Sequence, residues 1–353
     1  MTSGLRLVDG KGCGATFGMV LAGACVLIAA CGKPSAETNR LAALPLDPAS
    51  VTVSGLSAGA AMATQFHVAH SSLVNGAALI AGVPYYCSAG SISMSLGRCM
   101  KADEPIPTAE LVELTSRLAL EGSVDPIAGL ANDRVWIFRG ALDPYVQKPV
   151  ADAVEEYYNA LVNPANVARV ELDRAGHTFP SARADAKACD VTEPPFVGKC
   201  DFDGAGTLLA QMYGKLGAGR PPEQGELREF DQTPYAKASG SAGLADRGLL
   251  FVPKSCSGGD GPKCRLHVVF HGCKQGASLV GREFVLGSGY LEAAAGGDIV
   301  LLFPQIEPSY RPLNPLGCWD WWGYEGEDYA VKDGPQIKAV RLMIADLLGE
   351  PRG

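Results

Sequence analysis

The sequence lacks an excess of basic residues: in 353 residues, 38 Asp and Glu outnumber 30 Lys and Arg, and the net charge is −8. Because binding to nucleic acid depends on clustered Lys and Arg, this balance argues against a nucleic-acid partner. No apolar run after residue 31 is long enough to cross a bilayer. The 43 Gly and 24 Pro follow no period, which excludes a collagen-like chain. With 47% hydrophobic residues, the chain can bury a core and is expected to be globular.

Sequence signatures of metal sites and of repeat proteins are also missing. No Cys-x-x-Cys pair occurs, and the pair His67 and His70 has neither the spacing nor the Glu of a zinc-binding helix. No internal repeat is visible in the sequence. We therefore expect neither a metal ion nor an organic cofactor.

The first 31 residues have the pattern of an export signal. Arg6 and Lys11 precede an uncharged run over residues 14–30 that ends at Cys31. Small residues before a cysteine at the end of such a run resemble a bacterial lipoprotein signal, so Cys31 is predicted to carry a lipid. The alternative is an ordinary signal peptide that is cut nearby.

Either signal predicts that the chain leaves the cytoplasm, as an outer-membrane or cell-surface lipoprotein or as a secreted or periplasmic protein. Contact with a membrane is then expected only through the lipid. Residues 32–49 are polar and contain proline, which predicts a tether. Residues 50–353 are expected to form a single catalytic domain.

Eight of the 11 cysteines lie after the export signal. An even number of cysteines in an exported chain indicates disulfides. Close spacing along the sequence favours three of the pairs, and the fourth follows by elimination. The expected pairs are Cys87–Cys99, Cys189–Cys200, Cys256–Cys264 and Cys273–Cys318.

Strand-like apolar runs alternate with helical stretches over most of the domain. Such alternation predicts an α/β fold, with a mostly parallel sheet that is covered by helices on both faces. The Gly-, Pro- and Ser-rich stretch 217–248 is interpreted as a connector between two halves of one sheet, because neither half alone has enough strands. The strands are expected at 51–54, 76–81, 134–138, 167–172, 249–252, 266–270 and 299–303, and the helices at 58–70, 109–120, 150–161, 207–216 and 336–348.

The sequence Gly-Leu-Ser-Ala-Gly at 55–59 lies between an expected strand and an expected helix. In a nucleophile elbow, the serine of a Gly-x-Ser-x-Gly motif occupies a strained turn, and the glycines allow strand and helix to approach closely. The pentapeptide alone is a weak signal in a Gly-rich chain. Its position between strand and helix favours Ser57 as a nucleophile over a bystander in a tight turn.

A serine nucleophile needs a base, and the base needs a carboxylate that orients it. In hydrolases with this strand–turn–helix motif, both groups follow later strands in the order Ser, Asp, His. Asp143 comes after the strand 134–138 and His177 after the strand 167–172, so both lie where α/β proteins place ligand sites. Asp173 is the rival acid, because it directly continues a strand.

A His-Gly pair at 271–272 follows a further expected strand. In this kind of hydrolase, such a loop supplies one backbone N–H of the oxyanion hole, and the residue after the nucleophile supplies the other. The donors are predicted to be the amides of Cys273 and Ala58. The loop comes long after the serine instead of before it, so we predict a circularly permuted α/β-hydrolase whose ends open between the last helix and the nucleophile strand.

Across the domain, the motifs GLSAG, GALDP, AGHTFP, CDFDGAG, EFDQTPY, FVPKSC, CRLHVVFHGCKQ and NPLGCWDWWGY occur in this order. The set resembles the extracellular poly(3-hydroxybutyrate) depolymerases in their single-domain, circularly permuted form. The resemblance implies a polyester polymer or its oligomers as the substrate. It also implies the same catalytic residues and oxyanion donors that the strand ends indicate, and a substrate cleft formed in part by the aromatic segment 319–324.

Aromatic residues near two of the cysteines are candidates for the wall of that cleft, namely Trp319, Trp321, Trp322, Tyr85 and Tyr86. A cleft wall would face the methyl and methylene groups of a polyester. The alternative role for each of them is packing in the core beside a disulfide. Asp320 is expected to be structural, because a buried charge in an ester cleft would be costly.

Three other functions fit the same residues. A feruloyl or acetyl esterase and a poly(aspartate) hydrolase would use the same scaffold, although a polyanionic substrate favours a more basic chain. A catalytically inactive surface lipoprotein that binds polymer granules is the alternative that is not an enzyme. The intact set of Ser, Asp and His argues against this last function.

Overall fold

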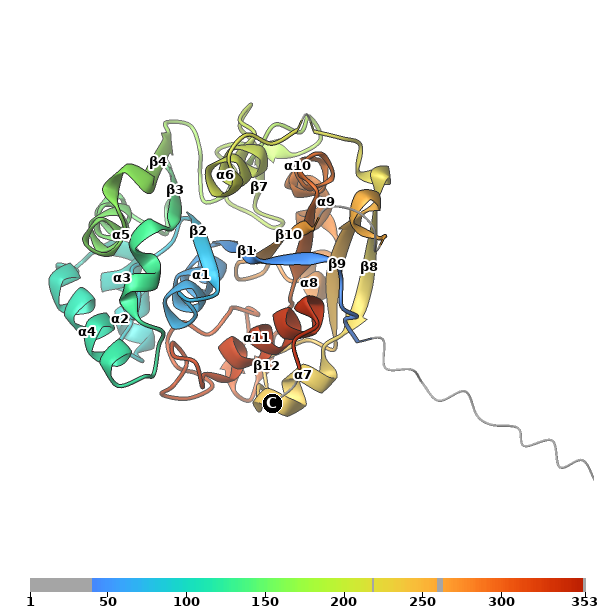
Figure 1. Ribbon diagram of the computed structural model, residues 1–353. Helices are drawn as coiled ribbons and strands as arrows, with labels where there is room; N and C mark the ends of the chain where they lie inside the picture. The colour runs from blue at the N-terminus through green and yellow to red at the C-terminus, as the bar shows by residue number, and fades with distance from the viewer. Residues whose placement is uncertain (1–39, 218, 259–262, 352–353) are drawn as a thin grey trace, which may run out of the picture. The chain divides into compact units, whose positions relative to one another are not determined.

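An eight-stranded sheet forms the centre of the computed structural model, which describes residues 40–351 except 218 and 259–262 (Figure 1). The strands lie side by side in the order β4-β3-β2-β1-β10-β11-β9-β8. Neighbours from β4 to β11 run parallel, whereas β9 is antiparallel to both β11 and β8. The strands of this sheet are β1 Leu46–Leu56, β2 Val74–Ile80, β3 Arg134–Gly140, β4 Val167–Leu172, β8 Gly225–Asp231, β9 Arg247–Pro253, β10 Cys264–Phe270 and β11 Ile299–Phe303.

Helices cover both faces of this sheet, as predicted. In Figure 1, α1 and α11 lie on one side of β1, and α6 and α10 lie on the other side. The helices are α1 Ala58–Ala69, α2 Ile92–Leu96, α3 Arg98–Lys101, α4 Thr108–Leu120, α5 Lys148–Leu161, α6 Gly204–Tyr213, α7 Thr233–Ser239, α8 Ala277–Val280, α9 Glu283–Gly287, α10 Tyr290–Gly297 and α11 Pro335–Leu348. Within the described residues, none of these helices has the length and apolar character needed to span a membrane.

The central strands and the helix between them are buried because their sequences are apolar on every side. All five residues of β11 are buried, and so are all twelve residues of α1. A parallel strand with helices on both faces has no solvent side, so its sequence is a continuous apolar run instead of an alternating one. Each expected strand and helix is present, with end points that differ by a few residues.

Two small sheets extend from the main one. The first contains β5 Phe179–Ser181, β7 Val197–Lys199 and β6 Lys187–Ala188, and the second is the hairpin of β12 Ser309–Tyr310 and β13 Leu313–Asn314. Short 3₁₀ helices lie at Ile127–Asn132, Pro164–Asn166, Pro222–Gln224 and Lys254–Cys256. Neither small sheet was expected, because their strands are only two or three residues long.

The two ends of the described chain meet beside the central strand. The amide of Leu44 donates a hydrogen bond to the carbonyl of Leu347 at 2.9 Å, so the segment before β1 lies against the end of α11. Joining α11 to β1 would place β10 and its loop before the nucleophile strand, which is the usual order in the α/β-hydrolases. The predicted circular permutation therefore agrees with the connectivity of the sheet.

The expected boundary at residue 50 is wrong by several residues. Strand β1 begins at Leu46, and Leu41 is already buried with 6% of its surface exposed. The described part of the expected tether, 40–49, thus packs against the domain. Pro45 and Pro48 interrupt the apolar residues of this stretch, and prolines argue against a strand when the sequence is read alone.

The stretch 217–248 is more than the connector that we expected. It contains the edge strand β8 and the helix α7, in which Tyr235 is buried. Strand β8 pairs with β9 along its whole length. Strand β8 is half-buried and most of its residues are charged, because a strand at the edge of a sheet faces water. A search of the sequence for apolar runs therefore does not find it.

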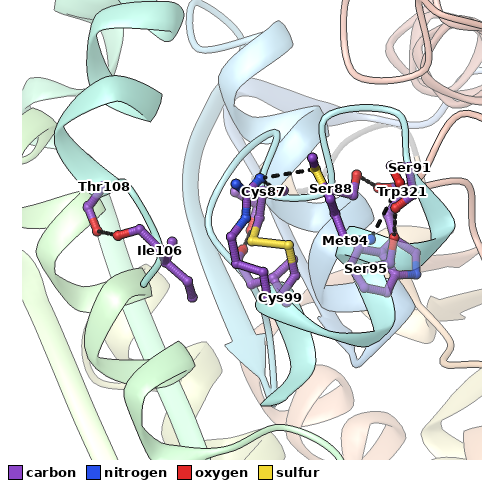
Figure 2. Close-up of a disulfide and its surroundings, with 12 residues drawn as sticks. Cys87, Ser88, Ser91, Met94, Ser95, Cys99, Ile106, Thr108 and Trp321 are labelled. Carbon is purple, nitrogen blue, oxygen red and sulfur yellow. Dashed lines mark hydrogen bonds between the residues drawn. A yellow bond between two sulfur atoms is a disulfide. The ribbon is translucent and has the colours of Figure 1, made fainter. Parts of the chain in front are cut away.

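The four predicted disulfides are all present: Cys87–Cys99, Cys189–Cys200, Cys256–Cys264 and Cys273–Cys318. Figure 2 shows the first of them, which ties the loop after β2 to α3. In the same view, the hydroxyl of Ser88 donates a hydrogen bond to the carbonyl of Trp321. This bond joins the disulfide-linked segment 87–99 to the C-terminal aromatic loop that contains Trp321.

Candidate active site

Ser57 lies at the turn between β1 and α1 with φ 58° and ψ −121°, a conformation that is strained for any residue with a side chain. The turn requires a residue without a side chain at position 59, because Gly59 packs directly against the end of the neighbouring strand β10. A Cβ at Gly59 would lie 2.2 Å from the carbonyl oxygen of Phe270, which no real side chain tolerates. The motif thus forms the elbow that its sequence predicts, with Ser57 at the carboxyl end of β1.

His177 and Asp143 meet although they come from different loops. Nδ1 of His177 donates to Oδ2 of Asp143 at 2.7 Å, and both residues are about 95% buried, with 5% and 4% of their surface exposed. The other carboxylate oxygen of Asp143 accepts the amides of Tyr145 and Val146 at 2.8 and 2.9 Å. Both oxygens of the Asp143 carboxylate therefore accept hydrogen bonds. Because Nδ1 of His177 carries the proton that it donates to Asp143, Nε2 is left as the proton acceptor.

The rival acid has no part in this pair. Asp173 is exposed and forms no hydrogen bond with His177. The amide of His177 is held by Oγ1 of Thr192 at 3.0 Å, and its ring meets the rings of Tyr145 and Phe196 edge to face. These contacts fix the imidazole from several sides.

The loop after β10 is held by His271 and Gln275. Burial lowers the pKa of His271 to about 4, so the ring is neutral near pH 7. Its Nδ1–H donates to the carbonyl of Gly272 at 2.8 Å, and its Nε2 accepts the amide of Ile306 at 3.0 Å. His271 therefore holds the loop through both of its ring nitrogens.

Gln275, which the sequence did not single out, links this loop to a third segment. Its Oε1 accepts the amide of Gly272 at 2.7 Å, and its Nε2 donates to the carbonyl of Pro195 at 2.7 Å. A Cβ at Gly272 would lie 3.6 Å from Cβ of Ser57, so the loop is next to the elbow. A buried amide side chain at this spacing has no sequence signature that separates it from a core residue.

A cleft of about 960 Å³ opens over these groups. Ser57, His177, Gly272 and Cys273 all line it. Ala58 is buried at the start of α1 and does not line the cleft. The remaining lining residues are Leu56, Gly90, Ile92, Leu96, Met100, Lys101, Tyr145, Phe196, Lys274, Leu313, Asn314, Pro315, Leu316, Cys318, Trp321, Trp322, Gly323 and Tyr324.

The geometry can support nucleophilic cleavage of an acyl compound. A serine hydroxyl and a histidine that a buried carboxylate orients share one cleft, and backbone amides lie beside the serine. Among the described residues, no hydrogen bond joins Ser57 to His177. Such bonds are often long before a substrate binds.

Two curated relatives cover nearly the whole domain. A protein of Delftia acidovorans named poly(3-hydroxybutyrate) depolymerase is 40% identical over 326 residues, which are 92% of this chain and 64% of the relative. A protein of Talaromyces funiculosus named polyhydroxybutyrate depolymerase is 32% identical over 326 residues, 89% of this chain and 94% of the relative. The chain belongs to the poly(3-hydroxybutyrate) depolymerase family.

Solved structures of the family have the same fold. The crystal structure of the PHB depolymerase from Penicillium funiculosum matches with a TM-score of 0.82 and 31% identity, over 88% of this chain and 99% of that chain. A PHB depolymerase complexed with an R3HB trimer matches with a TM-score of 0.82 and 30% identity over the same shares. The predicted α/β-hydrolase fold is thus confirmed. No family model matches the sequence.

The aromatic wall differs in part from the one that the sequence predicts for a PHB depolymerase. Trp321 and Trp322 line the cleft. The prediction is wrong for Trp319 and Tyr85, because both are buried in the core, with 0% and 1% of their surface exposed. Tyr86 also lies outside the cleft and stacks on Tyr329 at 5.4 Å.

Other apolar residues complete the wall and were missed. They are Tyr145 and Phe196 among the aromatics, and Ile92, Leu96, Met100, Leu313 and Leu316 among the other apolar residues. Tyr324 also lines the cleft, within the segment 319–324 that the resemblance implies. The missed residues come from four separate segments: the stretch with α2 and α3, the loop after β3, the loop before β7, and the β12–β13 hairpin with the residues that follow it. Only the folded chain brings these segments together, so no local pattern in the sequence marks them.

Asp320 shapes the C-terminal part of this wall. It is buried, with 2% of its surface exposed, and its carboxylate accepts four consecutive backbone amides. These amides belong to Trp322, Gly323, Tyr324 and Glu325, at 3.2, 2.7, 3.0 and 2.8 Å. Burial raises the pKa of Asp320, and the four bonds oppose that effect. The structural role expected for Asp320 fits these contacts.

The remaining histidines lie elsewhere. His67 bonds to Asp133 at 2.9 Å inside the domain. His267 lies within the sheet, where its ring nitrogens bond to Thr52 and Ser54 at 2.7 Å each, and burial lowers its pKa to about 3. None of these residues lines the cleft. Cys31, the predicted lipid site, lies outside the described residues.

Proposed function

We propose that this chain is a serine hydrolase that cleaves ester bonds of poly(3-hydroxybutyrate) or of its oligomers. The observation that carries the proposal is the shared cleft, in which Ser57 and the His177–Asp143 pair meet an apolar wall. The chain spans 64% of the length of the Delftia relative, so the activity of this domain is argued from its own residues as well as from that relationship.

The mechanism proceeds by acyl transfer in two steps. Nε2 of His177 takes the proton of the Ser57 hydroxyl, and Oγ attacks the ester carbonyl carbon. The amides of Ala58 and Cys273 hold the negative oxygen that forms. His177 then gives its proton to the departing alkoxide, which leaves as an alcohol, and the acyl group stays on Ser57.

Water completes the cycle. His177 takes a proton from a water molecule, whose oxygen attacks the acyl carbon. The second tetrahedral intermediate collapses, the acid leaves, and Oγ of Ser57 regains a proton from His177. Asp143 stays ionised and stabilises the imidazolium in both halves.

The wall of the cleft supports a polyester as the substrate. A 3-hydroxybutyrate repeat presents a methyl group, a methylene group and a neutral ester, and the wall presents aromatic and aliphatic side chains such as Trp321, Leu313 and Leu316. A structural neighbour is complexed with an R3HB trimer. A poly(aspartate) chain would place a carboxylate against this wall at every repeat, at a high desolvation cost.

The rim of the cleft also supports contact with a solid polymer. Ile92, Leu96 and Leu313 expose 49%, 53% and 67% of their surface, although they are large and apolar. All three line the cleft. A cluster of exposed apolar side chains around an opening is typical of a binding surface.

A panel of substrates tests the function. The purified chain should release 3-hydroxybutyrate from a poly(3-hydroxybutyrate) film, and it should release little or nothing from methyl ferulate or poly(aspartate). The variant Ser57→Ala should fold normally and lose activity on the film. Faster release from ferulate or poly(aspartate) than from the polyester would overturn the proposed substrate. If neither the wild type nor the variant were active on any of the three substrates, the result would favour the inactive polymer-binding protein.

We also propose that the chain is exported and carries a lipid on Cys31. The four disulfides support export, because they form in oxidising compartments. The full-length chain, expressed in a bacterium, should partition into detergent, whereas the variant Cys31→Ser should partition into the aqueous phase. Equal partitioning of both chains into water would leave the ordinary signal peptide as the explanation.

A further inference from the structure

Two lysines are the charged residues on the wall of the cleft, apart from His177. Lys101 is the last residue of α3, and Lys274 directly follows Cys273 in the loop beside Ser57. Both lysines are exposed. Among the described residues, neither ammonium group forms an ion pair or a hydrogen bond, so both are available to a ligand.

The nearby carboxylates do not offset this positive charge at the wall. Asp143 and Asp320 are buried, with 4% and 2% of their surface exposed, and neither lines the cleft. The oxygens of Asp143 are bonded to His177 and to two amides, and those of Asp320 to four amides. Among the described residues that line the cleft, the charged side chains besides His177 are thus both basic, in a chain whose net charge is −8.

We propose that Lys101 and Lys274 form a subsite for the terminal carboxylate of an oligoester, so that the cleft favours chains with a free acid end. This inference rests on the proposed hydrolysis of polyesters. A poly(3-hydroxybutyrate) chain is neutral along its length and carries one carboxylate at one end. The apolar wall contacts the repeats, while an ammonium group has a charged partner only at that end.

The position of Lys274 determines for which chain lengths the subsite increases binding most. Because Lys274 follows the predicted oxyanion donor Cys273, a carboxylate that it binds lies close to the ester that Ser57 attacks. Such binding favours short oligomers, in which the acid end and the scissile ester fit into one cleft. The same cleft would bind long chains mainly through its apolar residues.

Paired substrates test the subsite. The (R)-3-hydroxybutyrate trimer and its methyl ester differ in one charge, and the rate of cleavage of their internal esters is followed by chromatography at low ionic strength. The chains compared are the wild type, Lys101→Met, Lys274→Met and the double variant. Methionine keeps an unbranched side chain that is one atom shorter, and it removes the charge. Lys338→Met is the control, because Lys338 is exposed on α11 and does not line the cleft.

The measured quantity is the ratio of kcat/KM for the free acid to kcat/KM for the methyl ester. We expect a ratio of about ten in the wild type and in the control, which is the order expected for one charge-assisted contact. The ratio should fall towards one in the double variant, and high salt should lower it in the wild type. A wild-type ratio of one or less, or an unchanged ratio in the double variant, would overturn the subsite.

Failure of the proposed function would look different. In that case the wild type would cleave neither trimer. Calorimetric titration of both trimers into the wild type and the double variant then still tests the subsite. Tighter binding of the free acid, lost in the double variant, would support it, and equal binding of the two trimers would contradict it.

Discussion

At the scale of single residues, the carboxylate of Asp143 decides which nitrogen of His177 can accept a proton. The variant Asp143→Asn keeps an oxygen for the amides of Tyr145 and Val146, so the fold should be unchanged. Its amide group, however, donates to the ring and favours the wrong tautomer. We expect kcat on a short-chain nitrophenyl ester to fall by about 10⁴-fold, as in the serine proteases.

Thermal unfolding is the control for this variant, and its midpoint should stay within a few degrees of the wild type. A kcat within tenfold of the wild type would show that His177 does not depend on Asp143. Asp173→Asn provides the matched comparison, because Asp173 is exposed beyond the strand that precedes His177. This second variant should keep wild-type activity.

The sequence was sufficient to predict that these residues lie close together and insufficient to predict the wall. Ser57, Asp143 and His177 each follow a strand, so their common edge of the sheet can be derived from chain order alone. The cleft-lining Trp321 and the buried Trp319 have the same local composition. Which of the two lines the cleft depends on the packing of distant segments, and no pattern in the sequence contains that information.

At the scale of elements, the loop 320–325 is held by one side chain. Asparagine at Asp320 offers a single accepting oxygen in place of the carboxylate that binds four amides, so the loop should loosen. We expect Asp320→Asn to raise KM for a soluble oligomer by about tenfold, while kcat changes less, because Trp321 and Trp322 lie in the substrate wall and not at the reacting atoms.

The readout that separates positioning from general damage is the split between KM and kcat, together with the near-ultraviolet circular dichroism of the tryptophans. Asp333→Asn is the control, since Asp333 is exposed in the same region of the chain. An unchanged KM in the Asp320 variant would show that the loop keeps its shape without the carboxylate.

Elements with a run of apolar residues were predictable, including the edge strand β4, whereas the charged edge strand β8 was not. Strand β11 is a run of five buried apolar residues and was expected in its place. Strand β8 at the edge of the sheet is mostly charged, and the stretch that contains it was interpreted as a connector. The difference is physical: an edge strand is held by backbone hydrogen bonds to β9, and these leave little trace in the choice of side chains.

At the scale of the whole molecule, the meeting of the two ends makes the permutation testable. A chain in which residue 349 is joined to residue 41 by a short linker, and which opens at 217, would have the usual strand order. Since Leu44 and Leu347 are already in contact, the joint should cause little strain. We expect this permutant to fold and to keep esterase activity within about tenfold of the wild type. Failure to fold with every linker length tried would contradict the proposed equivalence of the two orders.

Buried histidines make the stability of the domain depend on pH. Burial lowers the pKa of His267 to about 3 and those of His70 and His271 to about 4, from 6.5 in an unfolded chain. Between these values the unfolded chain binds more protons than the folded one. The unfolding free energy should therefore be greatest above pH 6.5 and fall as the pH is lowered towards 4, by up to about 1.4 kcal/mol per pH unit for each histidine.

Urea unfolding at several pH values measures this dependence. The variant His267→Gln cannot bind that proton, so its unfolding free energy should fall less steeply with decreasing pH than that of the wild type. The variant is expected to be less stable near neutral pH, because it disturbs the bonds to Thr52 and Ser54. The test is the slope of the unfolding free energy against pH, and not the absolute stability. Equal slopes in the two chains would contradict the lowered pKa of His267.

The most direct test of the account is covalent labelling of the purified chain with a fluorophosphonate, followed by mass spectrometry of its peptides. If His177 activates Ser57 in the cleft, one adduct should form, on the peptide that contains Ser57, and it should be absent from Ser57→Ala and strongly reduced in His177→Ala. An unlabelled wild-type chain, or an adduct on a different serine, would contradict the assignment of this site.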